Sequence, residues 1–313
     1  MKVRIRFAKY GALKFIGHLD VMRYFQKVMR RADVAICYSG GFSPHQIMSF
    51  AAPLGVGITS KGEYLDIQVE VTEDLATMKE RMNRTMAEGF HVESCRRLPD
   101  QAGNAMSIVA AAGYTLSFRP GYEPEDPEKW MQAMETFYGR EEVFITKKTK
   151  KGTKELDLKP LVYALRAEGA SVYMLLSAGS AENIKPELVL DAFYQSLGEE
   201  RPPFAFMIQR ENVYAELPEG EQPSGAVSDR EQSSGAISDG GQPDGAKPDV
   251  EMPSAETDHD RDRYGSVMCC KGHCFISLED LGTAPEERLC QEDIRQGEKT
   301  RQEEKEDSRS WRD

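Results

Sequence analysis

The chain has 313 residues, a formal net charge of −12 and 40% hydrophobic residues. Residues 1–216 contain 28 basic and 28 acidic side chains, whereas residues 217–313 contain 12 and 24, so the negative excess lies entirely after residue 216. No stretch approaches the ~18 apolar residues of a membrane span. With two cysteines before residue 217, the sequence predicts no disulfide framework there. We therefore expect a soluble, cytoplasmic protein with a neutral folded body.

The first hundred residues predict a ferredoxin-like unit. Residues 2–7 alternate apolar and charged side chains, as a half-buried strand does. Apolar residues recur at helical spacing from Leu19 to Ala32, starting with Leu19 itself. A segment at 34–38 and a short apolar run at 47–52 follow, then strands at 64–71 and 90–98 with a helix at 73–88 between them that Thr72 could cap. The order of strand, helix, strand, strand, helix, strand is that of a split βαβ unit.

The second part of the chain predicts a modified copy of the same order. Its predicted elements are a strand at 111–118, a helix at 126–138, a hairpin at 143–148 and 153–158, a strand at 171–177, a helix at 186–197 and a strand at 204–214. The predicted fold class is therefore α+β, with tandem ferredoxin-like domains at 1–100 and 107–216. Near-repeats rich in Gly, Pro, Ser and acids follow, and we expect 217–313 to be a disordered acidic tail because such segments bury little apolar surface.

One cluster of residues has the composition of an acid–base or ligand site. It comprises Gly17-His-Leu-Asp20 and the loop Gly41-Phe-Ser-Pro-His45. His18 precedes the first predicted helix, where Asp20 can orient the imidazole, and His45 is the second candidate acid–base group. The alternative is structural: Asp20 caps the helix and His18 bonds to a backbone carbonyl.

Segregated cations form a second signal. Residues 1–31 contain nine lysines and arginines but one acid, Asp20. Local phosphate contacts can bind a polyanion even when the body is neutral. The RNA-binding candidates are Arg4, Arg6, Arg23, Arg30, Lys148 and Lys151, with Phe42 as a ring that could stack on a base. The alternative is a solvated strand face and an exposed lysine-rich hairpin tip.

The body offers no metal-ligand pattern, but the tail has one weak candidate. Cys269, Cys270, His273 and Cys274 have the side-chain types that bind zinc or an iron–sulfur cluster. Adjacent Cys269 and Cys270 cannot easily both ligate one ion, and thiols without a metal are the alternative.

Several motifs together resemble a bacterial family of unknown function, the radical-SAM-linked proteins. They are Lys9-Tyr-Gly-Ala-Leu-Lys-Phe-Ile-Gly-His-Leu-Asp20, Gly41-Phe-Ser-Pro-His45, Pro53-Leu-Gly-Val-Gly57 and Gly62-Glu-Tyr-Leu-Asp66. The resemblance covers about residues 1–215, with Gly17 and Gln46 departing from the usual serine and proline. It implies a partner: members are encoded beside, or fused to, a radical S-adenosylmethionine (SAM) protein with a cobalamin-binding-type domain.

Three functional hypotheses follow. The first is an accessory subunit of a radical SAM enzyme that binds or presents RNA, such as tRNA or rRNA. It has no cofactor of its own, because the partner carries the iron–sulfur cluster and SAM. The second is an RNA endonuclease in which His18, Asp20 and His45 are catalytic. The third is a protein–protein adaptor without nucleic-acid binding.

Overall fold

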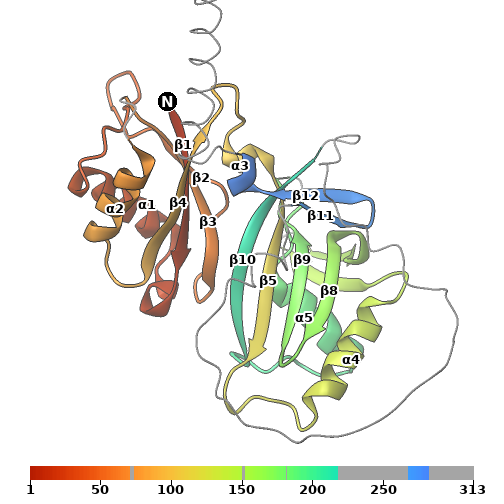
Figure 1. Ribbon diagram of the computed structural model, residues 1–313. Helices are drawn as coiled ribbons and strands as arrows, with labels where there is room; N and C mark the ends of the chain where they lie inside the picture. The colour runs from red at the N-terminus through yellow and green to blue at the C-terminus, as the bar shows by residue number, and fades with distance from the viewer. Residues whose placement is uncertain (71–73, 150–151, 181, 218–266, 282–313) are drawn as a thin grey trace, which may run out of the picture.

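The computed structural model describes residues 1–70, 74–149, 152–180, 182–217 and 267–281 (Figure 1). It confirms the α+β class. The first elements are β1 (Lys2–Lys9), η1 (Gly11–Phe15), α1 (His18–Arg31), β2 (Met48–Phe50), β3 (Thr59–Gln68), α2 (Leu75–Thr85), β4 (Phe90–Leu98) and α3 (Ala105–Ile108). The second group is β5 (Val109–Phe118), α4 (Pro127–Tyr138), β6 (Phe144–Thr149), β7 (Gly152–Asp157), η2 (Lys159–Leu161), β8 (Val162–Glu168), β9 (Ser171–Ser177), α5 (Pro186–Ser196) and β10 (Phe206–Glu216). Within the described ranges no helix has the length and apolarity to span a membrane.

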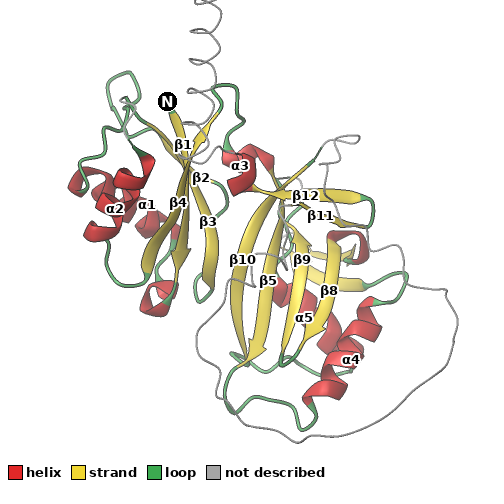
Figure 2. Ribbon diagram, in the orientation of Figure 1, coloured by secondary structure: helices red, strands yellow, loops and turns green. Residues whose placement is uncertain are grey.

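The N-terminal unit has the predicted ferredoxin-like topology. Its strands lie in the order β4-β1-β3, with the short β2 on the other side of β3, and all these pairs are antiparallel. Helices α1 and α2 lie together beside these strands (Figure 2). Phe25 of α1 and Met78 of α2 are buried against Ile5 and Phe7 of β1. Leu19, predicted to belong to the apolar stripe of α1, is 65% exposed.

The second unit repeats this sheet order. Its strands run β10-β5-β9-β8, and β6 and β7 form a separate two-stranded hairpin inserted after α4. Helices α4 and α5 cover one face, where Met134 and Phe193 are buried. Edge strand β8 was not predicted, although Tyr163, Leu165 and Ala167 alternate with the other residues of its sequence. It occupies the second-strand position that the hairpin does not fill.

The two units share one continuous sheet. Thr59 and Ser60 at the start of β3 pair in parallel with Gln209 and Arg210 of β10. Gly62 is required where the strands approach, because a Cβ there would lie 2.6 Å from the carbonyl oxygen of Glu211. The backbones can therefore meet only at a glycine.

Residues 267–281 correct the prediction of a fully disordered tail. They form β11 (Val267–Cys270), β12 (His273–Ser277) and η3 (Leu278–Leu281), and we call them the C-terminal strap. β12 pairs with the end of β10, and Phe275 of β12 is buried in a cluster with Tyr173 and Tyr214. In Figure 1 the strap is the blue segment that runs toward the N-terminal unit. The predictions for 218–266 and 282–313 lie outside the described residues.

Candidate functional site

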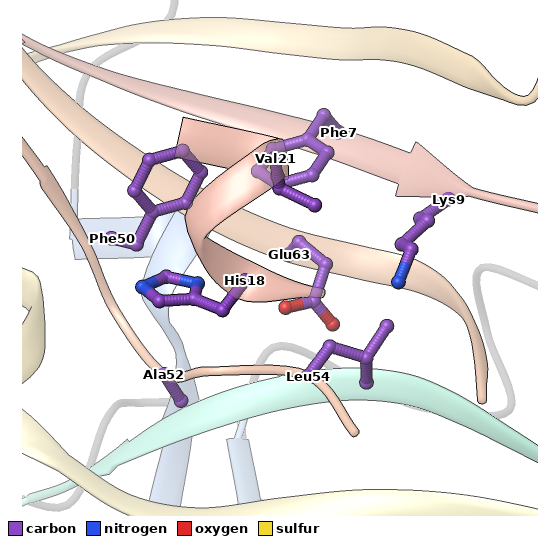
Figure 3. A pocket seen from close by; sticks show the side chains of 8 residues that line it. All are labelled: Phe7, Lys9, His18, Val21, Phe50, Ala52, Leu54 and Glu63. Atoms are coloured by element: carbon purple, nitrogen blue, oxygen red, sulfur yellow. The ribbon is translucent and has the colours of Figure 1, made fainter. Parts of the chain in front are cut away.

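A small pocket opens beside the first turn of α1 (Figure 3). His18 forms one wall, with Phe7 and Phe50 on one side and Glu63 and Leu54 on the other. The imidazole meets the Phe50 ring edge-on, with 5.4 Å between the ring centroids. The free space is about 10 Å³, which is close to the requirement of one water molecule. The pocket therefore fits a single small group rather than a whole metabolite.

Lys9 fixes the chain that leads into His18. It ends β1 and is 2% exposed, although it carries a charge. Its Nζ donates hydrogen bonds to the carbonyl oxygens of Ile16 at 3.1 Å and Lys14 at 3.5 Å. These bonds hold η1 over the strand end, so that α1 starts after Gly17 with His18 facing the pocket. Burial lowers the pKa of Lys9, and Glu63 partly opposes this shift.

Glu63 belongs to a buried ion pair that joins the two units. Its carboxylate accepts hydrogen bonds from Nε of Arg210 at 2.7 Å and from the Arg210 Nη2. Arg210 is 3% exposed and also donates to the carbonyl oxygen of Ala52 at 3.2 Å. Burial pulls the pKa of Arg210 down, but Glu63 and Tyr114 outweigh it and hold the pKa above its ordinary value. Glu63 therefore lines the pocket and also holds together the joint between the two units, where β3 meets β10.

His18 is held in its neutral form at pH 7. Burial lowers the pKa of His18 below its ordinary value, Lys9 adds to this effect and Glu63 opposes it. A neutral imidazole next to a buried carboxylate and a buried ammonium can donate or accept a hydrogen bond to a small polar group. It is thus a positioned polar contact in a pocket that Lys9 and Glu63 also line.

The other acid–base candidates do not converge on His18. Asp20 is exposed and pairs with Arg23 at 3.3 Å. His45 is exposed in its loop, where its Nδ1 hydrogen bonds to Oγ of Ser39 at 2.8 Å. The residues that line the pocket include Lys9 and Glu63 but neither Asp20 nor His45. Of the three predicted acid–base residues, only His18 lines this pocket.

Arg4 and Arg6 are not solvated phosphate contacts. Arg4 is 1% exposed and grips Asp66 with two hydrogen bonds, of 2.7 Å and 2.8 Å. Arg6 is half-buried and pairs with Glu279 of the C-terminal strap at 2.8 Å. The alternating pattern of β1 correctly placed both arginines on one face, but that face is covered.

Four exposed cations of the N-terminal unit lie along α1. Arg23 and Arg30, both predicted, are exposed, as are Lys27 and Arg31. Spacings of three, four, seven and eight residues place these side chains on one side of the helix. We call this set the α1 cation stripe.

The Phe42 loop is anchored close to that stripe. Phe42 is fully exposed at the loop tip. Nε2 of the buried Gln46 donates to the carbonyl oxygen of Gln26 on α1 and to the Tyr38 hydroxyl, both at 3.4 Å. The loop that carries Phe42 is therefore anchored to α1 through Gln46. Lys148 lies in β6, and Lys151 lies outside the described residues.

A disulfide overturns the prediction of a metal site in the tail. Cys269 and Cys274 face each other across β11 and β12 and are joined by it. His273 pairs with Glu216 through Nδ1 at 2.5 Å. Disulfide sulfurs are not thiolate ligands, and among the described residues no cluster of His, Cys, Asp and Glu has the geometry of a metal site.

Sequence reasoning missed Lys9, Glu63 and Arg210 as site residues. Lys9 and Glu63 belong to the motifs of the family resemblance, but their position in the motifs predicts no function for them. Arg210 sits in a strand 147 positions after Glu63, and no local signal pairs them. All three lie in strands that carry other charged or polar side chains, so the sequence offers no signal that singles them out.

A comparison with models of protein families identifies the family of this chain. Residues 2–186 match the model of an uncharacterized family of proteins conserved in bacteria, DUF2344. The chain belongs to this family. The DUF2344 match contains every pocket residue and ends at the first residue of α5, whereas Arg210 and the C-terminal strap lie beyond it.

The other comparisons add no functional information. A search of curated proteins gives no match. Among solved structures, a chain of the "Crystal Structure of a Cbf5-Nop10-Gar1 Complex" is similar at a TM-score of 0.34 and 12% identity, covering 67% of this chain and 48% of that one. This DUF2344 protein thus spans about half the length of that chain, and a likeness this low carries no argument.

Proposed function

We propose that this DUF2344 protein is an accessory subunit of a radical SAM enzyme that binds an RNA substrate and presents it for modification. The motif resemblance supports the choice of partner, which would carry the iron–sulfur cluster and SAM. The α1 cation stripe supports the RNA, and it replaces Arg4 and Arg6 as the proposed phosphate contact.

The α1 cation stripe is the observation that carries the proposal. Four exposed cations on one side of a helix can follow a phosphate backbone. The Arg23–Asp20 pair does not lock the stripe, because the two side chains are 70% and 63% exposed and such pairs contribute little. The cations are therefore available to an external polyanion.

Exposed aromatic rings also belong to the two segments that adjoin α1, the Phe42 loop and η1. Phe42 is fully exposed, and Phe15 of η1 is 64% exposed with the Lys14 ammonium 5.2 Å from its ring centroid. RNA-binding proteins stack unpaired bases on such rings, and nearby cations bind the backbone. The combination favours RNA with single-stranded bases over a fully paired duplex.

Salt-dependent RNA binding tests the proposal. The test variant replaces the α1 cation stripe with glutamine: Arg23, Lys27, Arg30 and Arg31. The matched control replaces four exposed cations of the second unit with glutamine: Arg119, Lys129, Arg140 and Lys185. Fluorescence anisotropy with a labelled total tRNA pool at 50 and 200 mM salt compares both variants with the unaltered full chain.

The expected difference follows from counterion release. Four phosphate contacts at a slope of about 0.7–0.9 each make the unaltered chain lose roughly 50- to 150-fold more affinity over this salt range than the test variant. The control should behave like the unaltered chain. Equal salt slopes for all three proteins would remove the α1 cation stripe from the interface.

Two further readouts separate the alternatives. Co-purification of the tagged chain with the radical SAM protein that the motif resemblance implies as its partner tests the accessory role, and failure to form a complex contradicts that role. Absence of RNA binding at 50 mM salt would favour the adaptor alternative. The apolar side chains of Leu19 and Val56, which are 65% and 63% exposed, also favour a protein contact. RNA cleavage that His18→Ala abolishes would instead identify an endonuclease.

A further inference from the structure

The helix-free face of β1 and β4 carries an unusual concentration of guanidinium groups. Ile5 faces the helices, so the alternating Arg4 and Arg6 face the other way. Arg96 of β4 is the direct cross-strand partner of Arg4. Like charges opposite one another destabilise a sheet. We call these three residues the arginine face.

The sheet itself supplies one closely bound counter-charge. Asp66 of β3 is engaged with both Nε and Nη2 of Arg4. Arg6 and Arg96 have their ion-pair partner in the C-terminal strap instead. Glu279 lies 2.8 Å from Arg6 Nη1 and 3.6 Å from Arg96 Nη2, and it is 14% exposed.

The strap makes further polar contacts at the same place. Arg4 Nη1 donates to the carbonyl oxygen of Leu278 at 3.1 Å, and Tyr64 shares a hydrogen bond of 3.1 Å with Ser277. Burial alone would raise the pKa of Glu279, but Arg6 and Arg96 help to hold it below its ordinary value. The carboxylate is therefore ionised and well matched to its site.

Two arginines around one oxyanion also match the chemistry of a phosphate. Guanidinium groups bind carboxylates and phosphates with the same planar donor geometry. We propose that the arginine face is a second RNA-phosphate site and that the C-terminal strap occupies it, with Glu279 in place of the phosphate. RNA and the strap then compete for Arg6 and Arg96.

The strap has a limited attachment that makes this competition feasible. β12 pairs with β10 over three residue pairs only. Glu279 belongs to η3, which follows β12, so η3 can leave the arginine face while β12 stays paired. Leu278, which is fully buried, is the apolar contact that this movement must break.

RNA is preferred over an acidic peptide because Arg6 and Arg96, on adjacent strands, suit successive phosphates of one backbone. The choice rests on the proposed function, and the α1 cation stripe would be the primary site. Removal of the whole strap would disturb the fold, because Phe275 and Leu278 are both buried. A single charge change at Glu279 is therefore the better test.

The experiment measures labelled tRNA binding to the full-length Glu279→Gln variant at 50 and 200 mM salt. The matched control is Glu199→Gln, which removes one exposed acid from the second unit. Two new phosphate contacts should make Glu279→Gln lose roughly 7- to 12-fold more affinity over this salt range than the unaltered chain. Adding Arg6→Gln and Arg96→Gln should abolish that difference.

The results separate this inference from the proposed function. Behaviour of Glu279→Gln equal to that of Glu199→Gln overturns the inference, whether or not the α1 cation stripe binds RNA. Binding by Glu279→Gln alone, with no binding by the unaltered chain, supports the inference and contradicts the stripe as the primary site. A gain that survives loss of Arg6 and Arg96 also overturns it.

Hydrogen–deuterium exchange of residues 274–281 supplies a second readout that needs no variant. Saturating tRNA should accelerate exchange of this segment in the unaltered chain, because η3 leaves the arginine face. Saturating polyglutamate, used as an acidic peptide probe, should have no such effect. Unchanged exchange with bound tRNA would refute competition, and acceleration by polyglutamate alone would make the site one for acidic peptides.

Discussion

Replacement of Arg210 by methionine should lower the free energy of unfolding more than any single substitution on the protein surface. Arg210 and Glu63 have side chains that are 4% and 5% exposed, and methionine keeps the apolar bulk while it removes the charge. Glu63 is then left buried, with Lys9 as the nearest cation lining its pocket. Removal of one partner from a buried ion pair costs roughly 3–5 kcal/mol.

Urea unfolding followed by circular dichroism measures this loss. With a slope of about 2 kcal/mol per molar urea, the midpoint should fall by roughly 2 M. The control is Arg201→Met, whose pair with Asp191 is 24% and 39% exposed and should contribute at most about 1 kcal/mol.

A double variant tests the physical reason. Glu63→Leu combined with Arg210→Met removes both charges, so it should recover more than half of the lost stability. A cost of less than about 1 kcal/mol for Arg210→Met would refute the assignment of Glu63–Arg210 as the joint. So would a double variant whose cost equals the sum of the two single costs.

Three other changes probe the joint, the strap and the pocket. Gly62→Ala should destabilise the chain by about 1–3 kcal/mol in the same urea assay, because the new Cβ meets β10 backbone, whereas Gly40→Ala, with open space around it, should cost far less. Reduction of Cys269–Cys274 should speed local hydrogen exchange in the β11–β12 hairpin by about 40-fold, from roughly 2 kcal/mol of loop-closure entropy, and an unchanged rate would show that β12 pairing alone holds the hairpin. The pKa of His18 is lower in the folded state than its unfolded value of about 6.5. Its contribution to stability is therefore present above pH 6.5 and is lost as the pH falls toward the folded pKa. An NMR titration midpoint at or above 6.5 would contradict the buried neutral imidazole.

The local elements could be predicted because their signals are local. β4 spans the predicted residues 90–98, and α4 starts at Pro127 after the Asp126 cap. α2 begins later than expected, at Leu75 with Asp74 as its cap, although Met78 and Met82 form the predicted buried face.

What could not be predicted depends on residues far apart in the sequence. Alternation in β1 separates Arg4 and Arg6 from the core but cannot tell a solvated face from one covered by Glu279, 273 positions after Arg6. The strap itself is a short ordered segment of an acidic tail, and composition averages conceal it. His18 was found from its motif, whereas its neighbours Lys9 and Glu63 depend on how η1 and β3 pack.

The shared sheet has a consequence for how the chain is synthesised. β1 to β4 come from one continuous stretch, so the N-terminal unit can form its own strand pairs while the rest of the chain is still being translated. The start of β3 must wait for β10, because Thr59 pairs with a residue 150 positions later. Until then Thr59 and Ser60 present an open strand edge, the kind of surface to which other chains add. Delayed translation between β4 and β10 should therefore favour aggregation, because the joint between the two units cannot close before β10 is made.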